Sequence, residues 1–370
     1  MTDGRFSDTL LAWYRENKRD LPWRCEVTPY RTWISEIMLQ QTRVEAVKGY
    51  FERFLAVLPT VEALASVPDE LLMKLWQGLG YYSRARNLKR AALEIVGKHG
   101  GALPSELPAL LALPGIGRYT AGAIASIAFG KRTPAVDGNV LRVYARVFGD
   151  ERDIADPRTR AAYEAAVEAL MPPESGTYAD GQNDCGDFTQ GLIELGATVC
   201  VPNGRPSCHL CPFASLCASH RDGMWESLPV KSRKAERRIE KRTVVILTDG
   251  ERFGLTKRPE TGLLAGLYEP INLEGELSAD EIRERLCALG IDGDAIRSVT
   301  PIGDAKHIFT HVEWQMTGYE VRVGHLMHRA EIVFRTLREI DADYAVPSAY
   351  RFFVKHMHGT EDARRGGETE

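Results

Sequence analysis

Four cysteines within eighteen residues place the tightest constraint on what this chain can fold into. Cys200, Cys208, Cys211 and Cys217 follow the spacing C-x7-C-x2-C-x5-C, whereas the other three of the seven cysteines are scattered. The odd total and the absence of an export signal argue against a disulfide framework and favour a reducing compartment. Clustered thiolates bind soft metals, so the segment predicts either an iron–sulfur cluster or a zinc site. The spacing favours the cluster and leaves zinc open.

The rest of the composition is that of an ordinary globular protein. A length of 370 residues predicts two or three domains. Hydrophobic residues make up 44% and charged residues 26%, which excludes a disordered or coiled-coil chain. No apolar run is long enough to span a bilayer, and the N-terminus lacks a secretory pattern. We therefore expect no membrane association and a cytoplasmic protein.

The net charge of −4 is unevenly distributed. Residues 1–225 carry −1, residues 226–242 carry +4 and residues 243–370 carry −7, which sum to −4. The overall acidity argues weakly against a nucleic-acid binder. The basic run KSRKAERRIEKR, within 226–242, predicts a solvated linker or helix face, and contact with phosphates is the alternative.

Hydrophobic periodicity changes character across this basic run. From residue 6 to about 221, apolar positions recur at spacings of three and four, which predicts short amphipathic helices. Residues 241–259 predict two strands around an Asp-Gly turn, 278–290 a helix, and 307–323 an alternating strand. We expect an all-α domain over 1–225, a basic linker over 226–242, an α+β domain over 243–358 and a disordered tail over 359–370.

A short glycine-containing segment separates two of the predicted helices. In LPGIG, Leu113 to Gly117, the glycines Gly115 and Gly117 allow a tight turn at a helix start. Backbone N–H groups in such a turn bind phosphate oxygens and position a duplex without reading its sequence. An ordinary corner between helices is the alternative for five residues taken alone.

Two carboxylates lie in contrasting sequence surroundings. Glu36 is flanked by apolar residues in WISEIML, and an apolar wall raises the pKa of a carboxyl so that it keeps its proton at neutral pH. Periodicity alone favours a solvated helix glutamate. Asp137 opens the predicted helix VLRVYARVF, where it would cap the helix and where the helix dipole favours its ionised form.

Residues 6–221 resemble the helix-hairpin-helix DNA glycosylases that carry an iron–sulfur cluster, and in particular the adenine-specific, MutY-type branch. The resemblance rests on the segments SEIMLQQTRV (35–44), GLGYYSRARNL (78–88), LPGIGRYTAGAI (113–124), VDGNVLRV (136–143) and IELGATVC (193–200). The C-terminal part resembles the Nudix-like domain of the same branch. The implied fold is multidomain: an all-α helix-hairpin-helix glycosylase domain with a cluster loop, plus a C-terminal α+β Nudix-like domain.

The resemblance implies roles for three residues. Glu36 would be the general acid that protonates adenine at N7, and Asp137 would stabilise the cationic sugar or form a transient adduct with it, as suits glycosidic hydrolysis. Tyr119 occupies the position at which bifunctional relatives that cut the DNA backbone have a lysine. Without that amine no Schiff base forms there, so we expect a monofunctional glycosylase. Tyr119 could instead assist the two carboxylates.

The same resemblance implies how DNA is held. Base extrusion leaves a hole in the stack that a side chain must fill. Gln40, Gln41, Tyr81 and Tyr82 are candidates, and by resemblance Gln41 and Tyr81 are the wedge residues. Without the motif they would be read as surface polar and core aromatic residues.

Further residues are assigned by resemblance to two recognition sites and to the metal centre. Trp23, Arg24 and Glu194 match positions around the adenine pocket. Phe309, Thr310 and His311 match positions that recognise 8-oxoguanine. The four clustered cysteines would hold a [4Fe-4S] cluster.

The sequence departs from the pattern of this branch in three places. The first cysteine gap has seven residues where six is commonest, and the extra residue falls in a Pro/Gly loop that can absorb it. Thr310 stands where relatives often have serine. The segment Glu281 to Gly290 lacks the glutamate-rich run with which a hydrolytic Nudix box binds magnesium, so pyrophosphate hydrolysis is not expected.

Three hypotheses follow for the function. The first is a monomeric adenine DNA glycosylase that acts on duplex DNA with adenine opposite 8-oxoguanine or guanine. The second is a bifunctional lyase for oxidised pyrimidines, which Tyr119 and the additional domain disfavour. The third is a catalytically silent lesion-binding module, which the presence of both Glu36 and Asp137 disfavours.

Overall fold

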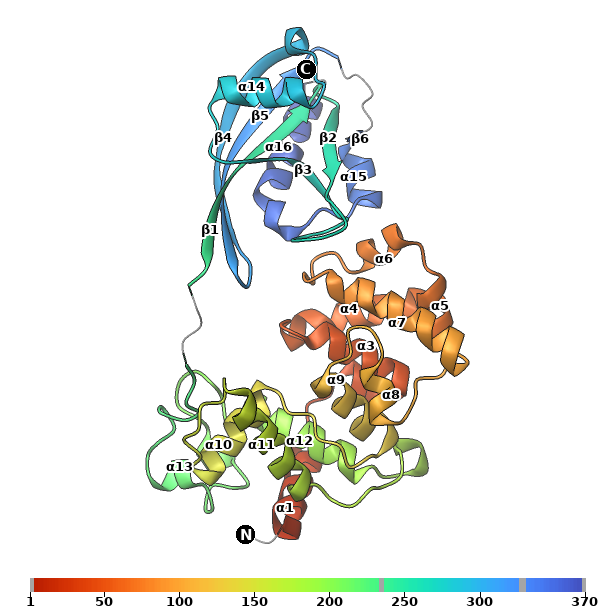
Figure 1. Ribbon diagram of the computed structural model, residues 1–370, viewed down its shortest axis with the longest axis vertical. Coiled ribbons are helices and arrows are strands. Elements are labelled where there is room, and N and C mark those ends of the chain that lie inside the picture. Colours follow the sequence, from red (N-terminus) through yellow and green to blue (C-terminus); the bar gives the residue numbers. More distant parts are fainter. Residues whose placement is uncertain (1–2, 233–235, 326–330, 368–370) are drawn as a thin grey trace. The chain divides into compact units, whose positions relative to one another are not determined.

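The computed structural model describes residues 3–232, 236–325 and 331–367, and the chain divides into two compact units (Figure 1). The first unit comprises Met1–Ser66 and Arg86–Lys234, and the second comprises Val67–Ala85 and Ala235–Glu370. In the described part of the chain, no helix has both the length and the apolar character that a membrane span requires.

The first unit is helical throughout its described residues, as predicted. Its α-helices are α1 (Asp3–Asn17), α2 (Pro22–Cys25), α3 (Pro29–Leu39), α4 (Val44–Val57), α5 (Val61–Ser66), α7 (Ser83–His99, which begins in the second unit), α8 (Leu107–Leu111), α9 (Arg118–Ala123), α10 (Gly138–Phe148), α11 (Pro157–Leu170), α12 (Asp184–Thr198) and α13 (Ala218–Arg221). A π-helix, η1 (Ile124–Ala128), and the 3-10 turns η2 (Tyr178–Asp180) and η3 (Cys208–Leu210) complete it.

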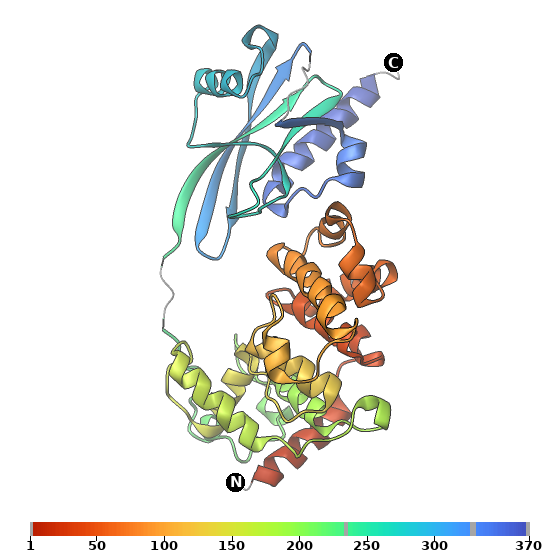
Figure 2. The ribbon, with the colours of Figure 1, turned by 45° about the vertical axis from the view of Figure 1, so that its right-hand side comes forward.

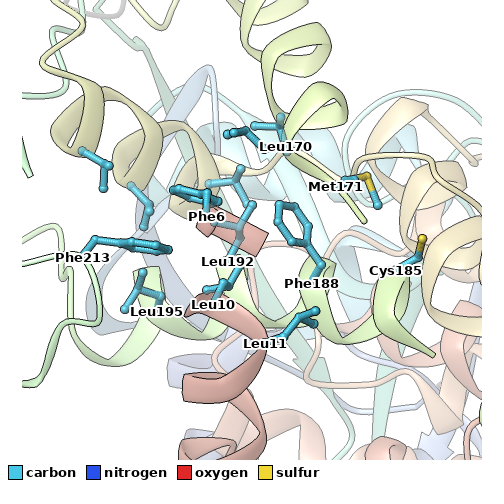
Figure 3. Close-up of a cluster of buried hydrophobic side chains, with 14 of the residues drawn as sticks. Phe6, Leu10, Leu11, Leu170, Met171, Cys185, Phe188, Leu192, Leu195 and Phe213 are labelled. Carbon is cyan, nitrogen blue, oxygen red and sulfur yellow. The ribbon is translucent and has the colours of Figure 1, made fainter. Parts of the chain in front are cut away.

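A hydrophobic core joins four helices of this unit to the cysteine-rich loop (Figure 3). Phe6 of α1 and Phe188 and Leu195 of α12 are buried there with residues of α10 and α11. Phe213 comes from the loop between Cys211 and Cys217, and its ring stacks on that of Phe6 with centroids 4.3 Å apart and an interplanar angle of 8°. The cysteine-rich loop is therefore anchored in the core by a fully buried aromatic ring.

The alanine-rich segment 118–130 is less regular than a single amphipathic helix. After α9 the ladder widens into the π-helix η1. The buried Asn183 side chain donates through Nδ2 to the carbonyls of Ser126 (3.0 Å) and Ile127 (2.9 Å). A side chain that inserts into a helical ladder in this way stabilises such a bulge. Ile127, which lies in this π-helix, lines the cavity described in the next subsection.

The second unit is built on one mixed sheet, as the α+β prediction requires. It contains α6 (Asp69–Leu75), β1 (Arg238–Thr248), β2 (Arg252–Lys257), β3 (Tyr268–Glu274), α14 (Ala279–Ala288), η4 (Gly293–Ala295), β4 (Ile296–Ile308), β5 (Val312–Val323), β6 (Ile332–Thr336), α15 (Leu337–Asp343), η5 (Ser348–Tyr350) and α16 (Arg351–Gly367). The strand order is β4-β5-β1-β3-β2-β6, in which β1 and β5 are parallel and the other paired strands antiparallel.

Each face of this sheet is covered by helix. Figure 2 shows α14 on one side and α16 on the other. Ile282 and Leu286 of α14 are buried in one core, and Tyr350 and Phe353, next to and within α16, are buried in the other. Within the same unit, α6 contacts α15: Lys74 Nζ donates to the carbonyls of Asp341 (2.5 Å) and Tyr344 (3.3 Å). Through these contacts Val67–Ala85 belongs to the second unit, although it lies between two segments of the first unit in the sequence.

Two boundaries differ from the sequence prediction. Strand β1 begins at Arg238, inside the expected linker 226–242, because residues 238–248 pair with β5 along their whole length. Its basic side chains are neutralised locally, since Glu240 pairs with both Arg238 (2.5 Å) and Arg242 (2.6 Å). Residues 233–235 of the same basic run lie outside the described residues.

The prediction of a disordered tail over 359–370 is wrong for most of its length. Helix α16 continues to Gly367, and only residues 368–370 lie outside the described part. Thr360 Oγ1 donates to the carbonyl of His356 (3.1 Å) within the helix. The polar composition of this stretch suggested disorder, but a helix that already packs on the sheet propagates at low cost into the residues that follow it.

Phe213→Ala should destabilise the first unit by about 3–5 kcal/mol, because it removes a fully buried ring and leaves a cavity against Phe6. Urea unfolding followed by far-UV circular dichroism would measure the change. Leu210→Ala, in the same loop but 58% exposed, is the matched control and should change the stability little. Equal stability of the Phe213 variant and wild type would contradict the anchoring role of this ring.

Candidate active site

A cavity of about 740 Å³ in the first unit collects most of the predicted functional residues. Those that line it are Trp23, Arg24, Glu36, Gln41, Gly117, Tyr119, Asp137 and Glu194. They come from α2, α3, α9 and α12 and from the residues that flank α3, α9 and α10. Segments up to 170 residues apart in the sequence therefore form one concave site, which is the usual form of a small-molecule or base pocket.

Glu36 is buried, as its apolar flanks predict, and not solvated as helical periodicity alone suggests. Only 7% of the residue is exposed, and Tyr119 donates a hydrogen bond of 2.8 Å from its hydroxyl to Glu36 Oε2. Burial raises the pKa of Glu36 to about 7; the hydrogen bond from Tyr119 lowers it, and the charge of Asp137 raises it. A carboxyl with this pKa is partly protonated at neutral pH and can act as an acid.

Tyr119 lines the cavity and contacts Glu36 directly. Burial and the neighbouring carboxylates raise the pKa of its phenol well above the ordinary value, so it remains a hydrogen-bond donor. The phenol therefore holds Glu36 in one orientation within the cavity.

Asp137 caps α10, as predicted. Its Oδ1 accepts from the backbone N–H groups of Asn139 (2.8 Å) and Val140 (2.9 Å), and its Oδ2 accepts from Asn139 Nδ2 (2.8 Å). Burial raises the pKa of Asp137, against the lowering effect of these hydrogen bonds. The helix dipole favours the ionised form, as the sequence indicates, whereas desolvation of the buried carboxyl acts in the opposite direction.

A chain of hydrogen bonds connects Asp137 to the cysteine-rich segment. Arg142 donates from Nη2 to Asn139 Oδ1 (2.8 Å) and from Nε to the carbonyl of Cys200 (2.7 Å). Helices α10 and α12 approach closely here: a Cβ atom added at Gly196 would lie 2.5 Å from Asn139 Cβ. The glycine in IELG is therefore required for the position of the Asp137 cap.

Glu194 is fully buried, and both of its carboxylate oxygens accept hydrogen bonds from arginines. Its Oε1 accepts from the backbone N–H (3.1 Å) and Nε (2.7 Å) of Arg19, and its Oε2 accepts from Arg19 Nη2 (2.9 Å) and Arg24 Nη2 (2.9 Å). Burial alone would raise the pKa of Glu194, but hydrogen bonds from the two arginines outweigh it and hold the pKa at about 2. Glu194 is thus an ionised anchor that orients Arg24.

Arg19 and Gln190 line the cavity and were not singled out from the sequence. Gln190 accepts from Arg24 Nε (3.0 Å) and donates to the Tyr178 hydroxyl (3.0 Å). Its position four residues before Glu194 places it on the same face of α12, which is a signal the sequence does contain. Arg19 has no comparable signal, because its partner lies 175 residues away.

Both predicted wedge residues have strained backbones. Among the described non-glycine residues, positive φ occurs only at Gln41 (58°), Tyr81 (49°) and Leu264 (55°). Gln41 and Tyr81 (46% exposed) are both exposed at turns, whereas Tyr82 is buried. Gln40, the fourth candidate, is half-buried and donates to Thr120 Oγ1 (3.2 Å). Left-handed conformations of non-glycine residues cost energy and concentrate at functional sites.

The LPGIG segment forms the predicted turn between α8 and α9. Gly115 has φ of 78°, and a Cβ atom added there would lie 2.6 Å from Asn87 Cβ, so glycine is required. Gly117 precedes Arg118 as the N-cap of α9, with no side chain bonded to the first N–H groups. Gly117 lines the cavity, whereas Gly115 does not.

Phe309, Thr310 and His311 form the tip of the β4–β5 hairpin in the second unit. Phe309 packs edge-on against Trp314 with ring centroids 4.8 Å apart, while Thr310 and His311 are exposed. In this unit the Tyr81 hydroxyl lies 3.3 Å from Thr310 Oγ1. One predicted wedge residue and the predicted lesion-reading tip are therefore neighbours.

The four clustered cysteines surround a small apolar cavity of about 30 Å³. None of them forms a disulfide. In the part of the chain that the structure describes, no three His, Cys, Asp or Glu side chains converge as a single metal ion requires. The seven-residue gap closes on itself through a hydrogen bond from the Ser207 N–H to the Val199 carbonyl (3.0 Å).

Two families match the chain in the order that the fold predicts. The HhH-GPD superfamily of base excision DNA repair proteins matches residues 34–169, and the NUDIX domain matches residues 242–356. Among solved structures, a thermostable thymine-DNA glycosylase superposes with a TM-score of 0.52 and 32% identity, covering 59% of this chain and 96% of its own.

Curated relatives extend the similarity over almost the whole chain. Adenine DNA glycosylases from rat (34% identical) and mouse (36% identical) each align with 96% of this chain and 79% of their own length. The enzyme from Buchnera aphidicola of Acyrthosiphon pisum is 34% identical over 72% of this chain and 74% of its own. The chain belongs to the adenine DNA glycosylase family and is a DNA N-glycosylase of base excision repair.

Proposed function

We propose that this enzyme excises adenine that is mispaired with 8-oxoguanine or guanine in duplex DNA, by hydrolysis without cutting the strand. The observation that carries the proposal is the buried Glu36 carboxyl, held by Tyr119 and facing the charge of Asp137 in one cavity. The cavity is large enough for an extruded purine nucleotide, and the surrounding arginines and backbone turns suit a phosphate-bearing ligand.

Glu36 would supply the proton that makes adenine a leaving group. With a pKa of about 7, a large fraction of the carboxyl is protonated at neutral pH, and burial strengthens its interaction with a base in the cavity. Tyr119 bonds to one carboxyl oxygen, Oε2, which leaves Oε1 to approach N7 of adenine. Loss of the protonated base leaves positive charge on the sugar.

Asp137 would stabilise this cationic sugar. Its two oxygens are fixed by Asn139 and Val140, so the carboxylate is pre-oriented. Among the described residues that line the cavity there is no lysine, and Tyr119 occupies the position where a Schiff-base amine would stand. This supports attack by water, and therefore a monofunctional reaction.

Mispair recognition would combine the two units. Gln41 and Tyr81 are exposed on turns whose strained backbone presents the side chain outward, as a wedge into the base stack requires. Thr310 and His311 are exposed at a hairpin tip that Phe309 fixes against Trp314. Thr310 could donate a hydrogen bond to N7 of 8-oxoguanine through its hydroxyl, with a methyl group that serine lacks.

We propose that Cys200, Cys208, Cys211 and Cys217 hold a [4Fe-4S] cluster. Four free thiols line one small apolar cavity, and they supply the soft sulfur ligands that an iron–sulfur cluster requires. The cluster would stabilise the loop between α12 and α13.

Glu36→Gln should reduce base excision by about 10²–10⁴-fold, because the amide cannot deliver the proton. Duplexes with adenine opposite 8-oxoguanine, adenine opposite guanine, and cytosine opposite thymine glycol would be compared on gels with and without alkali. We expect wild type to release adenine from the first two, with strand breaks only after alkali. Binding of the first duplex should survive in the variant, and near-normal excision by the variant would remove Glu36 from the acid role.

The single-turnover rate of wild type should fall about tenfold per pH unit above pH 7, because excision needs the protonated Glu36, whose pKa is about 7. A pH series of alkali-treated gels measures this rate. Unchanged rates from pH 7 to 9 would contradict the assignment.

The pKa of Glu36 also has a consequence for stability that needs no DNA. Because the folded pKa lies above the unfolded value of 4.5, wild type loses stability as pH rises from about 4.5 to 7. Glu36→Gln removes this loss and should be the more stable protein at pH 8, by up to about 3 kcal/mol. Urea unfolding between pH 5 and 8 measures the difference in free energy of unfolding between Glu36→Gln and wild type. Glu45→Gln, on the exposed surface of α4, is the control. If this difference does not increase with pH, Glu36 is not protonated in the folded protein.

Tyr119→Lys should create strand-cleaving activity, because an amine at this position can form a Schiff base with the sugar. Borohydride trapping on DNA with adenine opposite 8-oxoguanine reveals that intermediate as a covalent complex. Tyr119→Phe, which also loses the hydrogen bond to Glu36 but has no amine, should give none. If wild type gives as much covalent complex as Tyr119→Lys, the monofunctional assignment is wrong.

A further inference from the structure

Arg146 of α10 is a buried arginine that the proposed reaction does not use. It is 4% exposed, and in the described part of the chain its guanidinium donates to segments beyond its own helix. Nη1 donates to Cys200 Sγ (3.4 Å) and to the carbonyl of Val201 (3.0 Å). Its own backbone carbonyl accepts from Cys217 Sγ (3.2 Å). Arg146 therefore touches the first and the last of the four clustered cysteines.

The other bonds of this guanidinium hold the chain that leaves the cysteine-rich loop. Nη2 donates to the carbonyl of Trp225 (2.7 Å), and Nε donates to the carbonyl of Leu228 (2.8 Å). We refer to residues 225–232 as the strap. Other hydrogen bonds also hold the strap: Ile154 N–H donates to the Val230 carbonyl (3.0 Å), and Ser232 donates to Asp153 through its N–H (3.2 Å) and its hydroxyl.

The charge of Arg146 has no carboxylate partner among the described residues. Its acceptors are three backbone carbonyls and one sulfur. Burying a guanidinium costs free energy, which its hydrogen bonds offset in part and nearby negative charge offsets further. Thiolates that bind a metal centre provide that charge, whereas neutral thiols do not. Arg146 therefore contacts both the clustered cysteines and the strap.

We propose that Arg146 is a positioning residue that couples the metal centre to the strap, so that the occupied centre fixes the start of the interdomain linker and the emptied centre releases it. The coupling rests on the proposed centre, and the negative charge of the four metal-bound thiolates keeps the guanidinium in place. Loss of the centre would leave an uncompensated buried cation, which moves towards water and takes its hydrogen bonds away from Trp225 and Leu228.

The test is hydrogen exchange of the strap amides in the full-length protein, with and without its metal. Wild type, Arg146→Gln and Arg146→Lys would be compared as purified and after chelator treatment, with iron and sulfide contents measured for each. Arg132→Gln is the matched control, because Arg132 also donates to backbone carbonyls of this unit (Ala169, 3.1 Å, and Met171, 3.3 Å) and contacts none of the cysteines in the described structure. Visible circular dichroism of the loaded proteins reports directly on the cysteine environment.

Stripping wild type should increase strap exchange, and in loaded Arg146→Gln the strap should already exchange at the stripped rate, with no further increase on stripping. That variant should lose its visible absorbance to chelator about 10- to 100-fold faster than wild type, as expected when a group that bonds a metal ligand is removed. Arg146→Lys, which keeps the charge, should lose it at an intermediate rate and with an altered visible circular dichroism spectrum.

Three results would overturn the coupling: strap exchange that does not respond to metal in wild type, equal absorbance loss in Arg146→Gln and wild type, or the same changes in Arg132→Gln. Wild type that contains one zinc ion and no iron would overturn the proposed cluster alone. The exchange measurements on zinc-loaded and stripped protein would then still decide for or against the role of Arg146.

Discussion

The burial of the Glu36 carboxyl is the constraint on which the site depends. A carboxyl removed from water keeps its proton, and the fold provides that environment by surrounding α3 with apolar side chains and giving the carboxyl one donor, Tyr119. Glu194 lines the same cavity and is equally hidden, yet it is ionised because Arg19 and Arg24 donate four hydrogen bonds to it. Two buried glutamates within one cavity therefore have opposite pKa shifts, raised for Glu36 and lowered for Glu194.

Helix α12 organises the first unit around this cavity. One face contributes Phe188 and Leu195 to the core with α1 and α10. Another carries Glu194 to the cavity wall, and Gly196 lets α10 approach closely enough for Asn139 to hold Asp137. The helix ends next to Cys200, the first of the four cysteines. Core, pocket and cysteine-rich segment therefore share one rigid element.

Much of this arrangement could be predicted from the sequence, because the signals are local. The helical periodicity of the first unit, the cap at Asp137, the turn at Gly115 and the apolar flanks of Glu36 each lie within a few residues of the feature they predict. Resemblance to a known family supplied the assembly of distant motifs into one site, which the local patterns alone do not determine.

The features that were missed depend on residues far apart in the sequence. Arg19 meets Glu194 only because α1 packs on α12, 175 residues later. The π-helix arises because Asn183 inserts from a separate segment. Strand β1 begins early because it pairs with β5, some 70 residues further on, and such pairing overrides the charged composition that suggested a linker. Tertiary contact decides each of these cases.

The left-handed backbone at Gln41 and Tyr81 carries a thermodynamic cost for the free enzyme. Each such residue is less stable by roughly 1–2 kcal/mol than in an ordinary conformation, and glycine would relieve that cost. Glycine, however, has no side chain to fill a gap in stacked bases. In the proposed function, these two positions therefore exchange folding free energy for the capacity to distort a duplex.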